Sequence, residues 1–287
     1  MRIKLLLALL LFPVLVYGQE RYTVKGKIVN EEGQAVEYVQ VGVPKFQIGT
    51  ISTAEGLFEI EVPADTLEFF HVSYQSAFYP VTGKADDVVI VMREQELKPA
   101  VFIGGNTKEK FLLKSGSKVM GNMGIISFSL QNGRSEGREL GSVAVAHKPF
   151  LVKDILFSVH SNHIPGCVAS VNIYRIEGKN ESFVNILQKP IYCDVAVSDT
   201  PQYFDIQPED NLMLEPGRYF ISFQIVGCDE AALQAFLAKP QEERDYWEMT
   251  MDFIIYFKSS YVREAALGKM NPMPVNIGIA VKGLEYR

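Results

Sequence analysis

The segment VKGKIVNEEGQAVEYVQVGV, residues 24–43, carries the clearest pattern for predicting the fold of the first part of this chain. Apolar and charged side chains alternate on both sides of a turn that contains Gly33, which is the two-residue period of a β-strand. A second segment, GTISTAEGLFEIEVP at residues 49–63, repeats the arrangement around Gly56. Both glycines predict turns with positive φ, where a side chain would clash. With further apolar runs up to residue 92, the pattern predicts an antiparallel sandwich over residues 21–95.

These residues resemble the carboxypeptidase-D regulatory-like domain, a transthyretin-like module common in exported proteins of Bacteroidetes bacteria. The matching positions are Gly26, Gly33, Val39, Val41, Gly49, Thr50, Gly56 and Phe58. The chain departs from the family pattern at Ala35, where proline is frequent, and at Thr53, where aspartate is usual. The resemblance implies a seven-strand sandwich and no catalytic activity for the module itself.

The first residues have the layout of a secretory signal peptide. Arg2 and Lys4 precede an apolar run from Leu5 to Val16, and Gly18 ends a site with small residues. The run is about a dozen residues long, whereas a helix that spans a bilayer needs about 20. We therefore expect removal of residues 1–18 rather than a retained anchor. The expected location is the periplasm or the outer membrane, with the membrane contacted only by association.

The composition narrows the class of protein. The 287-residue chain has a formal charge of −6, which becomes −8 without residues 1–18, because that segment holds two basic residues and no acidic one. Such an acidic chain, with no run of lysine and arginine, offers no broad surface for nucleic acid. Hydrophobic residues make up 47% of the chain, enough for a large core in one or two domains.

Three cysteines, Cys167, Cys193 and Cys228, are an odd number for an exported chain. A Cys167–Cys193 bridge is one alternative, but spacing alone does not give the geometry that a disulfide requires. The favoured interpretation is three small, buried, apolar side chains. Their spacing does not predict a zinc site.

Residues 125–287 are predicted to form a second β-rich block, behind a connector at residues 96–124. Strands are expected at residues 125–130, 141–146, 152–160, 168–176, 184–187, 203–206, 219–226, 250–257 and 275–281. One short helix is expected between Asp229, which can cap it, and Pro240, which ends it. A second helical turn is expected over residues 261–267.

The second block also carries a resemblance. The segments GRELGSVAVAHKPFLVKDILFSVHSN, VNIYRI and YFDIQPEDNLMLEPGRYFISFQIV resemble a poorly characterised jelly-roll-like region that often follows such regulatory-like modules. This resemblance implies a second β-sandwich and implies no chemistry. The predicted fold class is therefore all-β, with a transthyretin-like sandwich followed by a jelly-roll-like sandwich.

Patterns for catalysis are weak. The four histidines stand in no His-x-x-Glu or His-Glu-x-x-His pattern, so the zinc site of a metallopeptidase is not predicted. Residues 133–137 fit Gly-x-Ser-x-Gly, but a nucleophile elbow requires a helix after it, and strand-like alternation follows. A polar hairpin turn is the better interpretation. Acidic residues near predicted loops could pair for glycoside hydrolysis, although an acidic chain usually keeps such residues solvated. They are Asp205, Glu209, Asp210 and Glu215.

Two pairs of residues are the candidates for ligand contact. His160 and His163 could reach one cation only from a bend, and a solvated pair at a strand end is the favoured interpretation. Tyr246 and Trp247, the only tryptophan, could stack on a sugar or anchor a partner. The competing and favoured interpretation places Trp247 in the core. No metal, cofactor or catalytic residue is predicted.

The sequence as a whole predicts an exported, non-catalytic protein that binds an envelope protein or a glycan at the cell envelope. The alternative is a glycan or peptide hydrolase with an unrecognised site in the second sandwich.

Overall fold

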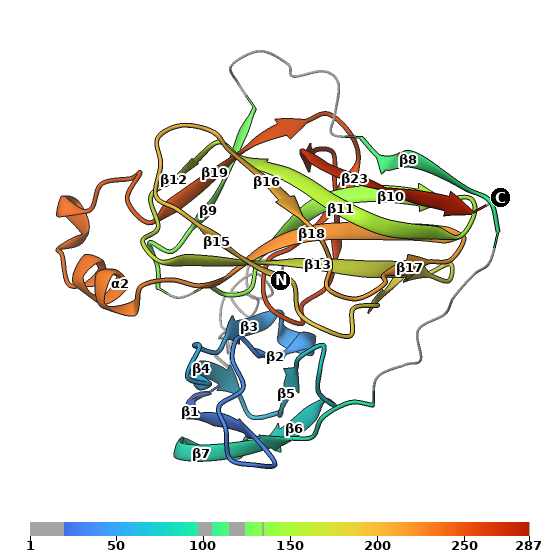
Figure 1. Ribbon diagram of the computed structural model, residues 1–287. Coiled ribbons are helices and arrows are strands. Elements are labelled where there is room, and N and C mark those ends of the chain that lie inside the picture. The colour runs from blue at the N-terminus through green and yellow to red at the C-terminus, as the bar shows by residue number, and fades with distance from the viewer. Residues whose placement is uncertain (1–19, 97–104, 115–123, 134, 287) are drawn as a thin grey trace, which may run out of the picture.

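The computed structural model describes residues 20–96, 105–114, 124–133 and 135–286. The expected signal peptide at residues 1–18 lies outside them. Nearly all regular structure is β-strand, which confirms the predicted all-β fold class. The strands form two sandwiches, the first blue to teal and the second green to red in Figure 1. No helix in the described residues is long and apolar enough to cross a bilayer.

The N-terminal sandwich contains the predicted seven strands in two sheets, ordered β4-β1-β7 and β3-β2-β5-β6. The strands are β1 (Arg21–Asn30), β2 (Gln40–Val43), β3 (Ile48–Ile51), β4 (Leu57–Pro63), β5 (Thr66–Phe70), β6 (Ala77–Pro80) and β7 (Ala85–Met92). Apolar residues that alternate along these strands fill the space between the sheets. One pairing differs from the expected antiparallel pattern. Strand β7 runs parallel to β1, because the chain returns to it from the opposite sheet.

Both predicted turn glycines have positive φ, +80° at Gly33 and +74° at Gly56. A Cβ atom at Gly33 would meet open space, so only the backbone conformation favours glycine there. At Gly56 a Cβ atom would lie 2.4 Å from the carbonyl oxygen of Ile28. Gly56 is therefore needed both for its conformation and for the close approach of β1.

The second sandwich has two large sheets and a smaller one. The large sheets are ordered β14-β13-β18-β10-β20-β21, with β15 beside β13, and β16-β11-β23-β8, with β17 beside β11. The small sheet is ordered β12-β19-β22, with β9 beside β19. The strands are β8 (Thr107–Leu113), β9 (Ile125–Ser129), β10 (Glu139–Ala146), β11 (Phe150–Val159), β12 (Ser161–Asn162), β13 (Cys167–Glu177), β14 (Ser182–Asn185), β15 (Tyr192–Val195), β16 (Gln202–Ile206), β17 (Met213–Leu214), β18 (Gly217–Gly227), β19 (Thr250–Tyr256), β20 (Ser260–Arg263), β21 (Asn271–Met273), β22 (Asn276–Ile277) and β23 (Ile279–Tyr286).

Four phenylalanines hold these sheets together. Phe128, Phe157, Phe223 and Phe253 come from β9, β11, β18 and β19 and meet edge to face, with ring centroids 4.8–5.8 Å apart. All four are buried. Because each ring comes from a different strand, this cluster fixes the small sheet against the two large ones.

The helix prediction is confirmed for the segment after Asp229. Helix α2 (Glu230–Leu237) begins there, and the Asp229 carboxylate accepts a hydrogen bond from the backbone N–H of Ala232 at 3.0 Å. Leu233 and Phe236 bury its apolar side. The helical turn expected over residues 261–267 is wrong. Strand β20 runs through Arg263, because it pairs with β10 and β21.

Strand β8 lies inside the segment 96–124, for which the sequence predicts no regular structure. It pairs antiparallel with β23 at the edge of a large sheet. Its charged side chains form ion pairs across that ladder, Lys110 with Glu285 and Glu109 with Lys282. Residues 97–104 and 115–123 of the expected connector lie outside the described residues.

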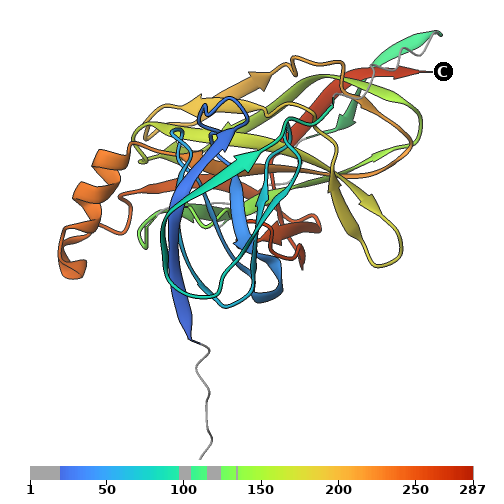
Figure 2. The same ribbon diagram turned by 90° about the horizontal axis from the view of Figure 1, so that it is seen from below.

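The two sandwiches pack against each other (Figures 1 and 2). The Tyr38 ring meets the Tyr192 ring edge to face, with centroids 5.1 Å apart. The Gln47 side chain accepts a hydrogen bond from the backbone N–H of Lys269 at 2.6 Å. Apolar contact comes from a small buried cluster of Ile51, Val226 and Ala266. The N-terminal sandwich therefore covers part of the outer face of the sheet that contains β18.

Candidate functional site

Tyr246 and Trp247 lie on the loop between α2 and β19, and both are exposed. The exposed fractions are 67% for Tyr246 and 53% for Trp247, and the rings meet edge to face with centroids 5.0 Å apart. The interpretation that Trp247 fills the core is therefore wrong. Met249, which is 6% exposed, enters the core just before β19 instead. Because both rings are exposed to water, a ligand that covers them gains binding free energy by removing their apolar surface from water.

Hydrogen bonds hold this loop in place. The side-chain amide of Gln131, just beyond β9, lies 2.5–3.3 Å from three carbonyl oxygens, those of Asp245, Tyr246 and Glu248. The Thr250 hydroxyl donates to the carbonyl oxygen of Trp247 at 2.6 Å. The Asp245 carboxylate accepts from the backbone N–H of Trp247 at 2.9 Å. The aromatic rings are therefore presented by a fixed backbone.

A groove of about 200 Å³ adjoins the aromatic loop, since Leu130 and Asn132, the neighbours of Gln131, line it. Its other polar lining residues are Ser127, Ser129, Ser135, Glu136, Arg138 and Glu264. Arg138 is 2.9 Å from the Glu264 carboxylate and donates to the carbonyl oxygen of Ser127 at 2.8 Å. We call this feature the β9 groove. Sequence patterns do not predict it, because its residues come from the continuous stretch from β9 to β10, from Ile225 of β18 and from Glu264 just after β20.

The two histidines lie on the other side of β19. The backbone N–H groups of His160 and His163 donate to the carbonyl oxygens of Asp252 and Thr250, both at 2.8 Å. His163 Nε2 is 2.9 Å from the carboxylate of Asp199. Within the described residues, no three histidine, cysteine or acidic side chains are grouped so that they could hold a metal ion.

Asp252 in β19 contacts two neighbouring strands, β9 and β12. It is 3% exposed, and its carboxylate accepts hydrogen bonds from Ser127 of β9 at 2.5 Å and from Ser161 of β12 at 2.8 Å. A buried carboxylate with such partners fixes neighbouring strands rather than contacting a ligand. All four candidate residues from the sequence thus lie around the start of β19, at the end of the sandwich that carries α2 in Figure 1.

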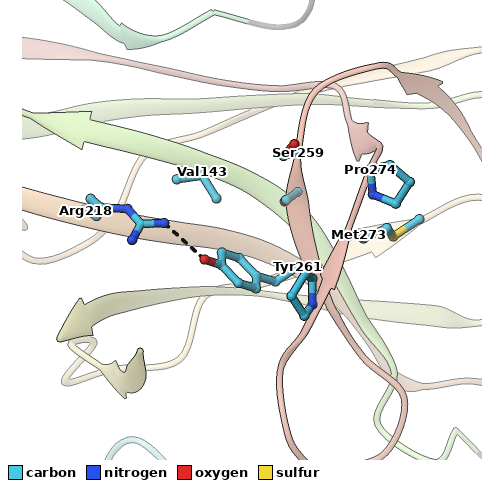
Figure 3. Close-up of a pocket in the computed structure, with 8 residues that line it drawn as sticks. Val143, Arg218, Ser259, Tyr261, Met273 and Pro274 are labelled. Carbon is cyan, nitrogen blue, oxygen red and sulfur yellow. Dashed lines mark hydrogen bonds between the residues drawn. The ribbon is translucent and has the colours of Figure 1, made fainter. Parts of the chain in front are cut away.

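A larger cavity, about 380 Å³, opens beside β20 and β21 (Figure 3). Val143, Tyr261, Met273 and Pro274 are among its apolar lining residues, and Arg218 is its charged one. Arg218 donates to the Tyr261 hydroxyl at 3.0 Å and to the Glu181 carboxylate at 2.8 Å. Because Glu181 already neutralises this cation, the cavity is the weaker candidate for a charged ligand.

The structure supports neither of the two catalytic patterns considered from the sequence, the Gly-x-Ser-x-Gly segment and the acidic residues near loops. Residues 133–137, of which Arg134 lies outside the described residues, connect β9 to β10. These strands belong to different sheets, so the segment is neither a nucleophile elbow nor the predicted hairpin turn. Asp205 lies in β16, whereas Glu209, Asp210 and Glu215 lie in loops, and all four are exposed.

Comparisons with known proteins identify no family. No family model and no curated protein matches the chain. A DUF3823 family protein from Parabacteroides merdae is 8% identical, with a TM-score of 0.21 over 90% of this chain and 98% of that chain. One from Bacteroides ovatus is 11% identical, with a TM-score of 0.21 over 73% and 99%. An infectious bursal disease virus structure is 8% identical, with a TM-score of 0.28 over 93% and 56%. TM-scores this low do not establish a shared fold, and the regulatory-like resemblance stays a prediction.

Proposed function

We propose that this chain is an exported, non-catalytic binding module of the bacterial cell envelope, whose partner is an envelope protein or a glycan. The observation that carries this proposal is the exposed pair Tyr246 and Trp247, fixed by Gln131 beside a polar groove. An aromatic contact contributes most to the binding free energy when its rings are exposed before binding and lose little conformational entropy on binding. The hydrogen-bonded loop provides both conditions.

The β9 groove supplies the polar half of such a site. The hydroxyls of Ser129 and Ser135, the Asn132 amide and the Glu136 carboxylate offer donors and acceptors to a polar ligand that also stacks on the rings. The same groove contains two carboxylates, as a hydrolase would need. However, the Glu264 side chain is 61% exposed and paired with Arg138, whereas a general acid is usually held in an apolar pocket. This difference favours binding over catalysis.

Trp247 allows a direct test, because as the only tryptophan it is the sole source of tryptophan fluorescence. Purified chain would be titrated with a panel of envelope glycans and with solubilised envelope proteins, and the emission of Trp247 followed. We expect a saturable change with one of these ligands. In calorimetry, Trp247→Ala should bind that ligand about 30-fold more weakly, since loss of a central aromatic contact costs about 2 kcal/mol.

Tyr203→Ala is the matched control, because Tyr203 is 83% exposed on β16. It should bind the ligand as the unaltered chain does. Unchanged affinity of Trp247→Ala, or an equal loss in Tyr203→Ala, would contradict the proposed surface. Cleavage of a glycan or peptide by the purified chain would favour the hydrolase alternative.

A further inference from the structure

The three cysteines, distant in sequence, converge at one end of the large sheet. Cys167 is the first residue of β13, and Cys228 directly follows the last residue of β18. The register pairs Val168 with Gly227. One step further, a Cβ atom at Gly166 would lie 3.0–3.4 Å from atoms of Asp229. Cys167 and Cys228 lie between these two contacts and are therefore directly opposed across the strands.

Both side chains also point to the same face. Val168 belongs to the apolar surface at the contact between the sandwiches, and a Cβ atom at Gly227 would lie 2.8 Å from the Tyr38 ring. Successive residues of a strand point to opposite faces. The neighbouring cysteines therefore face the interior, where Cys167 is 2% exposed and Cys228 packs against the same core.

Cys193 is a poorer partner for Cys167. The register pairs Cys193 with Ala169, and Cys167 with Val195, so the two cysteines are diagonal neighbours. Directly opposed Cβ atoms are about 4.5–5.5 Å apart, whereas diagonal neighbours are about 7–8 Å apart and their Cβ atoms somewhat less. A disulfide requires Cβ atoms about 3.5–4.5 Å apart. A small shift at the strand ends satisfies this requirement for the opposed pair only.

We infer that Cys167 and Cys228, both thiols in this structure, become joined by a disulfide bond when the protein is oxidised, and that Cys193 remains a thiol. The two thiols lose two protons and two electrons, and a new S–S bond forms. The electron acceptor is a small or protein disulfide, whose own S–S bond breaks to give two thiols. This pairing differs from the Cys167–Cys193 alternative that the sequence left open.

The order of attack follows from exposure. Cys228 is the less buried of the two and reaches the oxidant first, forming a mixed disulfide with it. Cys167 then attacks the Cys228 sulfur and displaces the oxidant as a thiol. Burial raises the pKa of Cys167, and the nearby Cys228 and Cys193 raise it further. Because thiolate is the nucleophile, this second step is the slow one.

The bond would link β13 to the start of the segment that contains α2 and the proposed binding surface. Cys228 immediately precedes Asp229, the cap of α2, and α2 leads into the loop with Trp247. A link to β13 limits movement at the start of this segment. The bond itself does not depend on what the loop binds, although an oxidising location rests on the proposed export.

The test uses the purified full chain treated with oxidised glutathione. Remaining thiols are alkylated in denaturant, and the chain is digested without reduction and analysed by mass spectrometry. We expect one alkylated cysteine, Cys193, and one cross-linked peptide pair holding Cys167 and Cys228 that separates on reduction. The Cys193→Ala variant should give the same cross-link, and Cys228→Ser should give none within the chain.

Three alkylated cysteines, or a cross-link that includes Cys193, would overturn the inference. If Cys228→Ser does not fold, the Cys193→Ala variant alone tests the bond. A disulfide between Cys167 and Cys228 closes a long loop, so reduction should lower the unfolding temperature of this variant by about 10 °C. An unchanged unfolding temperature, with both thiols alkylated before reduction, counts against the bond. Neither readout involves the ligand, so failure of the proposed function would leave this result intact.

Discussion

Among single residues, Glu139 and Arg263 stand out because they are charged and buried, with exposed fractions of 0% and 7%. Their side chains are 3.2 Å apart. Glu139 also accepts hydrogen bonds from the hydroxyls of Tyr174 at 2.9 Å and Ser222 at 2.7 Å. Burial on its own lowers the pKa of Arg263, but the Glu139 carboxylate and Tyr174 outweigh it, and the pKa is raised. Arg263 also donates to Gln40 of the N-terminal sandwich at 3.3 Å.

Replacing Arg263 with methionine should be costly, because it leaves the Glu139 carboxylate buried without its cation. We expect a loss of about 3–5 kcal/mol in the free energy of unfolding, measured by urea denaturation. The double variant with Glu139→Gln should recover part of this loss. Lys25→Ala, which breaks an exposed pair with Glu59, is the control and should leave the midpoint unchanged. Equal losses in the single and double variants would contradict this account.

At the scale of elements, the aromatic loop depends on one side chain from another strand. Gln131→Ala removes the amide that holds three loop carbonyl groups, so Trp247 should become more mobile. The expected result is a lower fluorescence anisotropy of Trp247 with an unchanged far-ultraviolet circular dichroism spectrum. Gln207→Ala is the control, since Gln207 is an exposed glutamine that bonds only to Asp154 among the contacts described. Unchanged anisotropy in Gln131→Ala would show that other contacts hold the loop.

The elements also show what the sequence could predict. The cap at Asp229 and the stop at Pro240 are local, and they predict α2 correctly. The sequence does not predict strand β8, because its lysines and glutamate lack an apolar alternation and its ion-pair partners lie far along the chain on β23. The sequence favours a core position for Trp247, because an aromatic residue beside a strand usually packs there. The β9 groove could not be predicted, since residues from the stretch 127–138, Ile225 and Glu264 come together only when the chain folds.

For the whole molecule, the contact between the sandwiches contains a buried titratable group. His71 of the N-terminal sandwich is 8% exposed. Its Nδ1 accepts a hydrogen bond from the backbone N–H of Ser73 at 3.2 Å, and its Nε2 is 3.3 Å from the Tyr192 hydroxyl of the second sandwich. Burial lowers the pKa of His71 from 6.5 to about 4. The imidazole is therefore neutral when the sandwiches are packed together at neutral pH.

This burial predicts a loss of stability in acid. Below pH 6.5 the unfolded chain binds a proton at His71, while the folded chain does so only near pH 4, so stability falls as pH falls through this window. The full effect is roughly 3 kcal/mol. Unfolding temperatures of the unaltered chain and His71→Gln, compared at pH 7.5, 5.5 and 4.5, should converge as the pH decreases. The tyrosines around His71, which are Tyr38, Tyr74 and Tyr192, have pKa values raised above 10 and do not titrate there.

Glu37 is the group that could mask this dependence. Burial raises its pKa, so its contribution to stability is present at low pH and decreases as pH rises through the raised value, opposite in sign to that of His71. Introducing Glu37→Gln into both the unaltered chain and the His71→Gln variant removes the contribution of Glu37 to the pH dependence. If the two chains still show parallel curves between pH 7.5 and 4.5, the imidazole is not excluded from water at the contact. The sandwiches would then separate more readily than their packing around Tyr192 indicates.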